Sequence, residues 1–335
     1  MRYLSILLLS AGLIPVTGWV APAADASGAA KPQGAKVALE TVMPEPIYVA
    51  IQSSGRVEVL PSGETWSGIE GAHYDALSSD GRWLLVSGLK TGKAYLIDTQ
   101  SGELSTRIEI GELAQGVKIS PDDRYGVAVA AKQGTIVVID LSTQQVAKTI
   151  RVGDTPHNIR FSADGELAYV TLQGEGAIAM VDMQTLEKRR TIATPGLDTP
   201  HNLDFSEDGR YLWIRDFVGR VGVLDLKTKE MVQTFEVGDA HGGIDVIPGG
   251  EYVATSAIAG SKVTLIDAED REIAARVEVG NGPHGVRASA DGRYLYVAVT
   301  GEDAVAVVDM QSLEVVRHQP VDGSFPFWIA VPGNR

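Results

Sequence analysis

The feature that most constrains this chain is a repeat of about 42 residues that runs through most of its 335 residues. In the clearest copy, residues 153–182 read GDTPHNIRFSADGELAYVTLQGEGAIAMVD. An aspartate at the end of an aliphatic run recurs at steps of 42, 42, 43, 42 and 42 residues, as Asp98, Asp140, Asp182, Asp225, Asp267 and Asp309. A period of this length, made of short strands and tight turns, is typical of a stacked or radial β-architecture.

Each repeat divides into four short strands, which in the clearest copy are residues 157–161, 166–172, 177–181 and 188–192. The turn Ser162-Ala163-Asp164-Gly165 separates the first two, because Asp bonds its own backbone and Gly adopts a positive φ. Related turns begin at Ser78, Ser120, Ser206 and Ser289, with a variant at Ile247-Pro248-Gly249-Gly250. Four strands in about 42 residues correspond to one blade of a β-propeller.

The number of blades follows from the first strand of each repeat. It begins at His73, Gln115, His157, His201, His241, His284 and Phe327. The chain ends after the strand at Phe327, whereas residues 46–51 and 56–60 form strands with no inner strand before them. We therefore predict an all-β, seven-bladed β-propeller over residues 46–335, closed by pairing of the N-terminal and C-terminal strands in one blade.

The first 45 residues have a different composition. Arg2, an apolar run from Leu4 to Val20 and the small residues Ala21-Pro22-Ala23 predict a cleaved signal peptide over residues 1–23 and a periplasmic or secreted protein. Residues 24–45 are rich in Ala, Gly, Ser, Lys and Pro and predict a flexible linker. After cleavage of the signal we expect no membrane span.

Charge and cysteine content exclude several classes of protein. The formal net charge of −14 argues against nucleic acid or an anionic membrane as a partner. The chain has no cysteine, which excludes disulfides, thiolate metal sites and c-type haem attachment. We expect a monomer.

Several motifs together are similar to the YVTN family of β-propellers. They are Gly-x-x-Pro-His, the Ser-x-Asp-Gly turn, Tyr169-Val170-Thr171, and the aliphatic-Asp pairs Val181-Asp182 and Val308-Asp309. The resemblance covers the whole mature chain and implies a seven-bladed, often exported protein, without fixing an activity. A shorter stretch, residues 215–226, resembles the propellers that carry or help to make haem d1.

Five of the six histidines occupy the same repeat position, at the start of an innermost strand: His73, His157, His201, His241 and His284. Innermost strands line the channel of a propeller, so we expect these imidazoles to form a ring around one axis. Nitrogen ligands without thiolate suit copper or zinc. We expect the four consecutive blades from His157 to His284 to supply the ligands, and Asp75 and Asp239 to accept hydrogen bonds from the rings.

A second interpretation of the histidines remains open. Pro-His-Gly-Val is close to the ordinary repeat of the resembling family, so duplication alone can account for five aligned histidines. In that case they are solvated residues at the channel mouth or bond backbone at the start of each strand.

A second level lies three residues further along each innermost strand. It includes Lys118, Arg160 and Arg287, which predict a site for a small anion or a ligand carboxylate. The alternative is that each base pairs with Asp204 or a turn aspartate.

Three functions remain at this stage. The first is a periplasmic protein that holds copper or zinc, or another small ligand, in the channel for storage, delivery to a protein partner or cofactor assembly. The second is a lactonase-like hydrolase or a haem d1-related binding protein, and the third is an interaction scaffold without catalysis. If the ring holds a metal, the ordinary pKa of imidazole predicts that occupancy falls between about pH 6.5 and 5.

Overall fold

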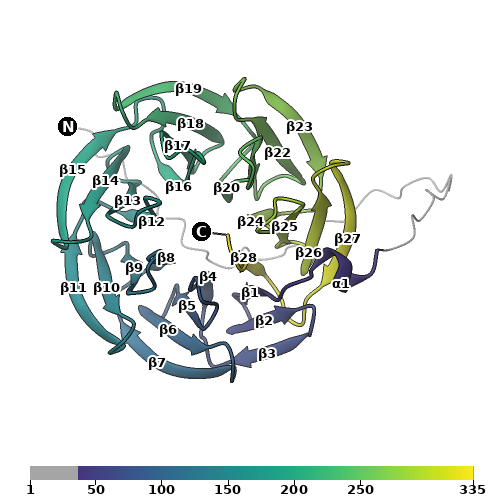
Figure 1. Cartoon of the computed structure of the whole chain (residues 1–335), viewed down its shortest axis with the longest axis horizontal. Coiled ribbons are helices and arrows are strands. Elements are labelled where there is room, and N and C mark those ends of the chain that lie inside the picture. The colour runs from purple at the N-terminus through teal and green to yellow at the C-terminus, as the bar shows by residue number, and fades with distance from the viewer. Residues whose placement is uncertain (1–36, 335) are drawn as a thin grey trace, which may run out of the picture. The chain divides into compact units, whose positions relative to one another are not determined.

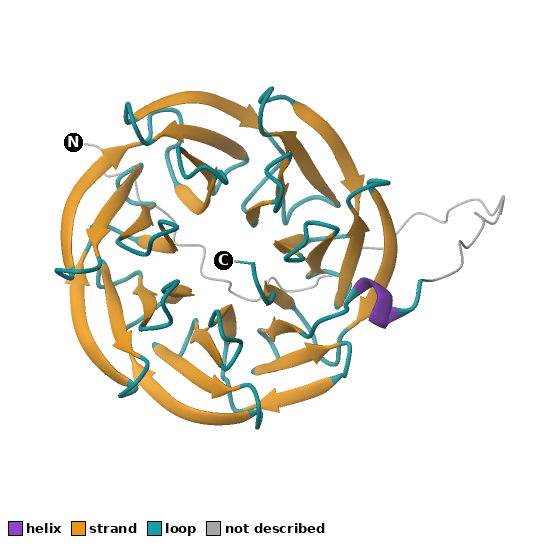
Figure 2. Cartoon of the chain, viewed as in Figure 1, coloured by secondary structure: helices purple, strands orange, loops and turns teal. Residues whose placement is uncertain are grey.

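Seven four-stranded antiparallel sheets surround one axis in the computed structural model, which describes residues 37–334 (Figure 1). The predicted seven-bladed all-β propeller is confirmed, and a single short helix is its only helix within the described range (Figure 2). The predicted signal peptide and the linker up to residue 36 lie outside the described residues. Within those residues, no helix combines the length and the apolar character that crossing a bilayer requires.

Each blade contributes one strand to each of four concentric positions. The innermost strands are β4 (Ala72–Leu77), β8 (Ala114–Ile119), β12 (Pro156–Phe161), β16 (Pro200–Phe205), β20 (Ile244–Val246), β24 (Pro283–Ala288) and β28 (Pro326–Ala330). The second strands are β1 (Ile47–Ile51), β5 (Trp83–Gly88), β9 (Tyr125–Ala130), β13 (Leu167–Leu172), β17 (Tyr211–Asp216), β21 (Tyr252–Ser256) and β25 (Tyr294–Val299).

The outer half of each blade is equally regular. The third strands are β2 (Arg56–Leu60), β6 (Lys93–Asp98), β10 (Thr135–Asp140), β14 (Ala177–Asp182), β18 (Arg220–Asp225), β22 (Lys262–Asp267) and β26 (Ala304–Asp309). The outermost strands are β3 (Glu64–Ser67), β7 (Glu103–Glu109), β11 (Gln145–Arg151), β15 (Glu187–Ala193), β19 (Glu230–Glu236), β23 (Ile273–Glu278) and β27 (Glu314–Pro320).

The repeated turn residues act as the sequence predicts. Ser162 Oγ donates to Asp164 Oδ1 at 2.6 Å, the same oxygen accepts from the backbone N–H of Glu166 at 3.0 Å, and Gly165 has φ 73°. The aspartate that ends the third strand also forms a turn, since Asp182 Oδ1 accepts from the backbone N–H of Gln184 and of Thr185. Local hydrogen bonds therefore end the strands at fixed positions in each repeat.

Burial differs between the strands of one blade. The third strand β10 buries Ile136, Val137, Val138 and Ile139, because it is packed between neighbouring blades. The outermost strand β7 alternates exposed residues with half-buried ones and buries only Ile108. The core thus lies between the blades and leaves the axis to the residues of the innermost strands.

The two ends of the described chain meet in one blade. β28 pairs antiparallel with β1, with Val49 opposite Ile329, and β1 continues into β2 and β3. Trp328 of β28 is 2% exposed and packs on Tyr74 of the next blade, with ring centroids 4.3 Å apart. This pairing leaves no blade with an open inner edge.

The structure differs from the sequence prediction at the end of the linker. Residues Leu39–Val42 form helix α1, and Val42 and Met43 are buried against the last blades. The hydroxyl of Tyr296 donates to the carbonyl of Val42 at 2.8 Å. The packed part of the chain therefore begins before Pro46, because these apolar side chains cover the seam next to β25 and β26.

Candidate functional site

The predicted ring of histidines lies at one end of the channel, where the innermost strands begin. Each successive pair of rings is in contact from His157 through His201, His241 and His284 to Phe327, with centroid separations of 3.7, 4.9, 5.1 and 3.7 Å. His73 stacks on Phe327 at 4.1 Å and its Nε2 lies 3.1 Å from Oε1 of Gln115. The repeat register therefore brings side chains from all seven blades to one level.

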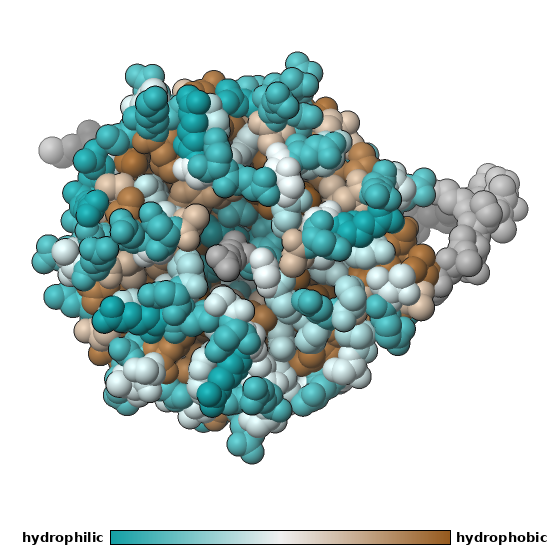
Figure 3. Space-filling view, in the orientation of Figure 1, coloured by the Kyte–Doolittle hydropathy of each residue, from teal (hydrophilic) through white to brown (hydrophobic). Residues whose placement is uncertain are grey.

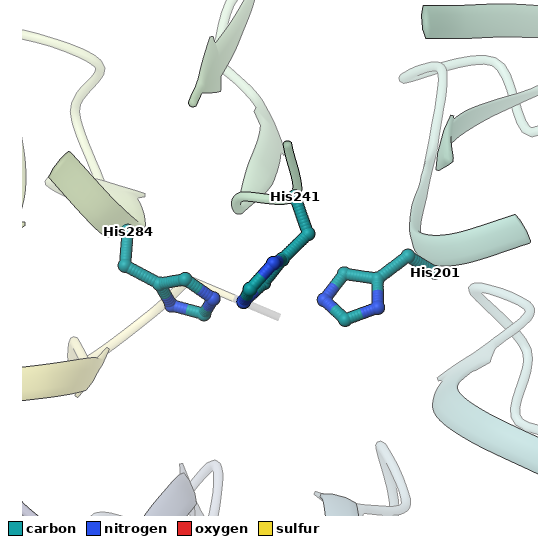
Figure 4. Close-up of side chains that lie close together, drawn as sticks. All are labelled: His201, His241 and His284. Carbon is teal, nitrogen blue, oxygen red and sulfur yellow. The ribbon is translucent and has the colours of Figure 1, made fainter. Parts of the chain in front are cut away.

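Three of these imidazoles form a group that could hold a metal ion. The ligand atoms of His201, His241 and His284 all lie within 4.8 Å of one another. In Figure 4, His201 and His284 point toward each other from β16 and β24, and His241 lies between them. The group offers three nitrogen donors from three consecutive blades.

Burial keeps these rings neutral. It lowers the pKa of His201 and His284 well below the usual 6.5, and neighbouring imidazoles lower it further. The pKa of His241 is lowered to about 4, by burial and by the positive charge of Arg215. Metal coordination needs the neutral imidazole, so positive charge on the rings does not oppose binding at neutral pH.

Hydrogen bonds of the other ring nitrogen orient two of the donors. His284 Nδ1 lies 3.1 Å from the carbonyl oxygen of Phe327, which can only accept, so the proton is on Nδ1 and Nε2 carries the lone pair. Nε2 of His284 and Nε2 of His201 are both buried without a hydrogen-bond partner. Buried polar atoms are normally satisfied, so this unpaired couple fits a site that takes a ligand.

Gln173 controls the corresponding proton of His201. Its side-chain amide nitrogen lies 2.8 Å from His201 Nδ1, an arrangement in which Nδ1 accepts and Nε2 carries the proton. Rotation of the amide by 180° would place Oε1 there, which accepts from Nδ1–H and frees the lone pair of Nε2. Metal coordination through Nε2 requires the second arrangement.

His241 differs from the other four because it precedes its strand. It lies in the loop before β20, is half-buried, and stacks on Phe217 with centroids 4.6 Å apart and an interplanar angle of 8°. Arg215 is fully buried and donates to backbone carbonyls in this loop, those of Gly238 and Ala240. This arginine holds the loop that carries His241 against β17.

The structure does not group all four imidazoles of the run from His157 to His284. His157 stacks on His201, and its Nδ1 lies 3.1 Å from the backbone oxygen of His201, but it is outside the three-histidine group. His73 is also outside the group; burial lowers its pKa to about 3. Their assignment as ligands stays a prediction.

The prediction that Asp75 and Asp239 accept hydrogen bonds from the histidine rings is wrong. Asp75 is buried with both oxygens unpartnered and makes no hydrogen bond to His73, and Asp239 is exposed. Backbone carbonyls take this role for His157 and His284. Which carbonyl accepts depends on the path of the backbone between blades, and the identities of the residues do not reveal that path.

A buried polar layer lies just beyond the histidines along the innermost strands. The hydroxyl of Tyr74 donates to Asn202 Oδ1 at 3.2 Å, the amide of Asn158 donates to the same oxygen, and Asn202 Nδ2 donates to the carbonyl of Gly242 at 2.7 Å. Tyr74, Asn158 and Asn202 are at most 3% exposed. The repeated His-Asn pair in two adjacent blades was a signal for this layer that the sequence analysis did not use.

The predicted cationic level lies beyond this layer. Arg160 Nε donates to Asp204 Oδ1 at 3.1 Å, and Arg287 Nη1 donates to Asp245 Oδ1 at 2.9 Å. Both arginines are therefore paired with carboxylates, as the alternative interpretation held for Asp204. Lys118 has no hydrogen bond or ion pair from its Nζ to any residue between 37 and 334, although it belongs to the same level.

Asp245 is the residue of this level that sequence analysis missed. Counting three residues from His241 gives Ile244, but Gly242-Gly243 adds one residue to this blade and moves Asp245 into place. The double glycine was the available signal. Gly243 lies against the backbone of His284, where a Cβ would come within 2.8 Å of the carbonyl oxygen.

Comparisons with known proteins agree with the fold. The family model for YNCE-like beta-propellers matches residues 78–289, more than half of the chain. A solved structure of Kuenenia stuttgartiensis hydrazine synthase is similar with a TM-score of 0.71 and 22% identity over 79% of this chain and 90% of that one, a likeness of fold alone. No curated protein matches significantly. This chain belongs to the YNCE-like beta-propeller family.

Proposed function

We propose that this protein binds a transition metal ion, copper or zinc, through His201, His241 and His284. The observation that carries the proposal is the convergence of their ligand atoms within 4.8 Å, with Nε2 of His201 and of His284 buried and unpartnered. Imidazole nitrogens without thiolate are a suitable donor set for either metal.

The geometry favours a site that can exchange its ion. Zn–N bonds of 2.0–2.1 Å in a tetrahedral shell need about 3.4 Å between donor atoms, so the three donors, which lie within 4.8 Å of one another, fill three positions of the shell when they move closer around an ion. Three protein ligands leave one coordination position open for water or for a donor from another molecule. Storage or delivery of the ion, or assembly of a cofactor, fits such a position.

We further propose that the protein works in the periplasm or outside the cell and passes its ion to a protein partner. The apolar N-terminal run and the small residues at 21–23 support export. Fractionation of cells that express the full chain tests this part, and recovery of the protein with its first 23 residues in the cytoplasm would overturn it.

The test of the metal site is substitution by glutamine, because Gln115 already occupies the equivalent position of the ring. His201→Gln, His241→Gln and His284→Gln should each weaken binding of Zn²⁺ or Cu²⁺ by at least about 10- to 100-fold, the loss that changes in an outer shell already cause. Titration calorimetry of metal-free protein measures the dissociation constant and the stoichiometry, for which we expect one ion per chain.

Two control variants locate the site. His73→Gln changes an imidazole of the ring that lies outside the three-histidine group, and His318→Gln changes an exposed imidazole of β27. Both should bind metal nearly as the unmodified protein does. An equal loss in His73→Gln and His241→Gln would contradict the three-histidine site.

A further inference from the structure

A cavity of about 410 Å³ lies at the end of the channel opposite the histidines. Its rim is formed by turns that follow the innermost strands, including those that begin at Ser78, Ser120 and Ser162. The last described residues, Gly333 and Asn334, contribute to one side of it. In the orientation of Figure 1, hydrophilic and apolar residues alternate around the centre of the face turned to the viewer (Figure 3).

Six apolar side chains form part of the wall of this cavity, which elsewhere also includes polar residues of the turns. They lie near the ends of the innermost strands and are Leu77, Ile119, Phe161, Phe205, Val246 and Val331. In four of the blades this residue comes directly before the serine of the turn. A volume of about 410 Å³ is within the range of about 300–1,000 Å³ that small-molecule sites occupy.

The floor of the cavity is charged. Two cations, Lys118 and Arg160, line it together with the carboxylate of Asp204, and the charge of Arg287 is close to Lys118. The carboxylates of this level already accept hydrogen bonds. Asp204 accepts from Arg160 and from the backbone N–H of Val246, and Asp245 accepts from Arg287 and from the backbone N–H of Ala288. Asp75, the third carboxylate near this level, is not part of the cavity lining.

Two groups on this floor keep free donors. Arg160 makes its one hydrogen bond within the described chain through Nε, and its Nη2 lies 4.0 Å from Asp245 Oδ1, an ion pair too long for a hydrogen bond. Both Nη groups therefore keep unused N–H donors, and Lys118 Nζ makes no hydrogen bond to any residue from 37 to 334. Burial, together with the nearby charges of Arg160 and Arg287, lowers the pKa of Lys118 well below its usual value. A cation in such surroundings is costly unless an anion joins it.

We propose that this cavity binds a small organic acid, whose carboxylate bonds Lys118 Nζ and the Nη groups of Arg160 and whose apolar body lies against the six-residue wall. Guanidinium and ammonium groups on one side of a carboxylate form charge-assisted hydrogen bonds, and the wall accounts for selection of an apolar body over a free inorganic anion. The site is independent of the metal site, because the polar layer of Tyr74, Asn158 and Asn202 separates them.

The test compares four probes on metal-free protein: phenylacetate, acetate, inorganic phosphate and benzyl alcohol. Titration calorimetry should give the tightest binding for phenylacetate, at one molecule per chain. Acetate lacks the apolar body and benzyl alcohol lacks the charge, so both should bind more weakly by at least about tenfold. Phosphate binding as tight as phenylacetate, or no binding of phenylacetate, would overturn the proposal.

Lys118→Met identifies the anchoring group. The substitution keeps the length of the side chain and removes a buried charge, so it should not impair folding. The dissociation constant for phenylacetate should rise about 10- to 100-fold, the factor lost with one charge-assisted hydrogen bond. Lys132→Met is the matched control, since Lys132 is exposed and paired with Glu112; an equal effect of both variants would refute the assignment. His241→Gln should leave phenylacetate binding unchanged, which keeps this test separate from that of the metal site.

Discussion

Burial decides what each histidine of the ring can do. His73, His157, His201 and His284 are at most 5% exposed, and His241 is half-buried. Their positions could be predicted from the repeat, because equivalent residues of successive blades reach the same level. The grouping of His201, His241 and His284 could not be predicted from the sequence. It depends on the rotation of each ring and on which group lies next to the ring nitrogen that does not face the site.

The lowered pKa values change the expected pH dependence of metal binding. With the pKa of His241 at about 4 and those of His201 and His284 also well below 6.5, protons do not compete for the donors between pH 7 and 5. Affinity should therefore stay nearly constant over this range and fall below about pH 4. Equilibrium dialysis at successive pH values measures this, and a decline already present between pH 6.5 and 5 would restore the expectation drawn from the sequence.

The same shifts act on the stability of the metal-free protein. An unfolded imidazole has a pKa near 6.5, so the unfolded chain binds more protons than the folded chain below that pH. The free energy of unfolding therefore falls as pH drops through 6.5 toward 4, by up to about 1.4 kcal/mol per pH unit for each buried histidine. Binding measurements at low pH should accordingly be accompanied by circular dichroism.

At the scale of elements, the hairpin loop between β17 and β18 organises one side of the metal site. Asp216 is fully buried and accepts from the backbone N–H of Val218, Gly219 and Arg220 at 2.7–3.1 Å. The loop thereby presents Phe217, 39% exposed, flat against the ring of His241. The sequence of this loop is the one that resembles the haem d1 propellers, and here its residues orient a histidine.

Loss of the Phe217 ring should weaken metal binding, chiefly through His241, on which it stacks at 4.6 Å, and also through His201, which it meets edge-on at 5.4 Å. Phe217→Ser removes a stacking contact worth about 0.5–1.5 kcal/mol, so the dissociation constant should rise about 2- to 10-fold. Val218→Ser is the control, because Val218 is an apolar residue of the same loop, is 54% exposed and carries no aromatic ring that could stack on His241. Equal dissociation constants for the two variants would show that the stack does not position His241.

The blade built on β20 shows where prediction at this scale ends. Its innermost strand has three residues, whereas the other blades have five or six, and both its turn and its Gly242-Gly243 pair depart from the repeat. Regular blades could be placed from the spacing of their turns. The irregular blade could not be placed in this way, because one added residue shifts every later side chain. Asp245 therefore lies at the level where the spacing predicts Ile244.

At the scale of the whole molecule, the ring depends on one seam between the chain ends. Trp328 of β28 packs on Tyr74 and lies under the guanidinium of Arg287 at 4.8 Å. Trp328→Ala should lower the free energy of unfolding by about 3–5 kcal/mol, the usual cost of truncating a buried tryptophan.

Urea denaturation followed by fluorescence and by circular dichroism measures this loss. The two signals should shift together, because opening the seam exposes the edges of both neighbouring blades. Trp83→Ala is the comparison, since Trp83 is half-buried at the start of β5 and should cost less. An equal loss of unfolding free energy in the two variants would mean that the seam is no more sensitive to truncation of a tryptophan than the start of β5.

The hydrogen-bonded layer of Tyr74, Asn158 and Asn202 lies between the level of the histidines and the level of Lys118 and Arg160. The two proposed sites therefore share no side chain, and each is nearer to a different face of the propeller. If both proposals hold, a single chain can carry a metal ion and an organic acid at the same time, without competition between them.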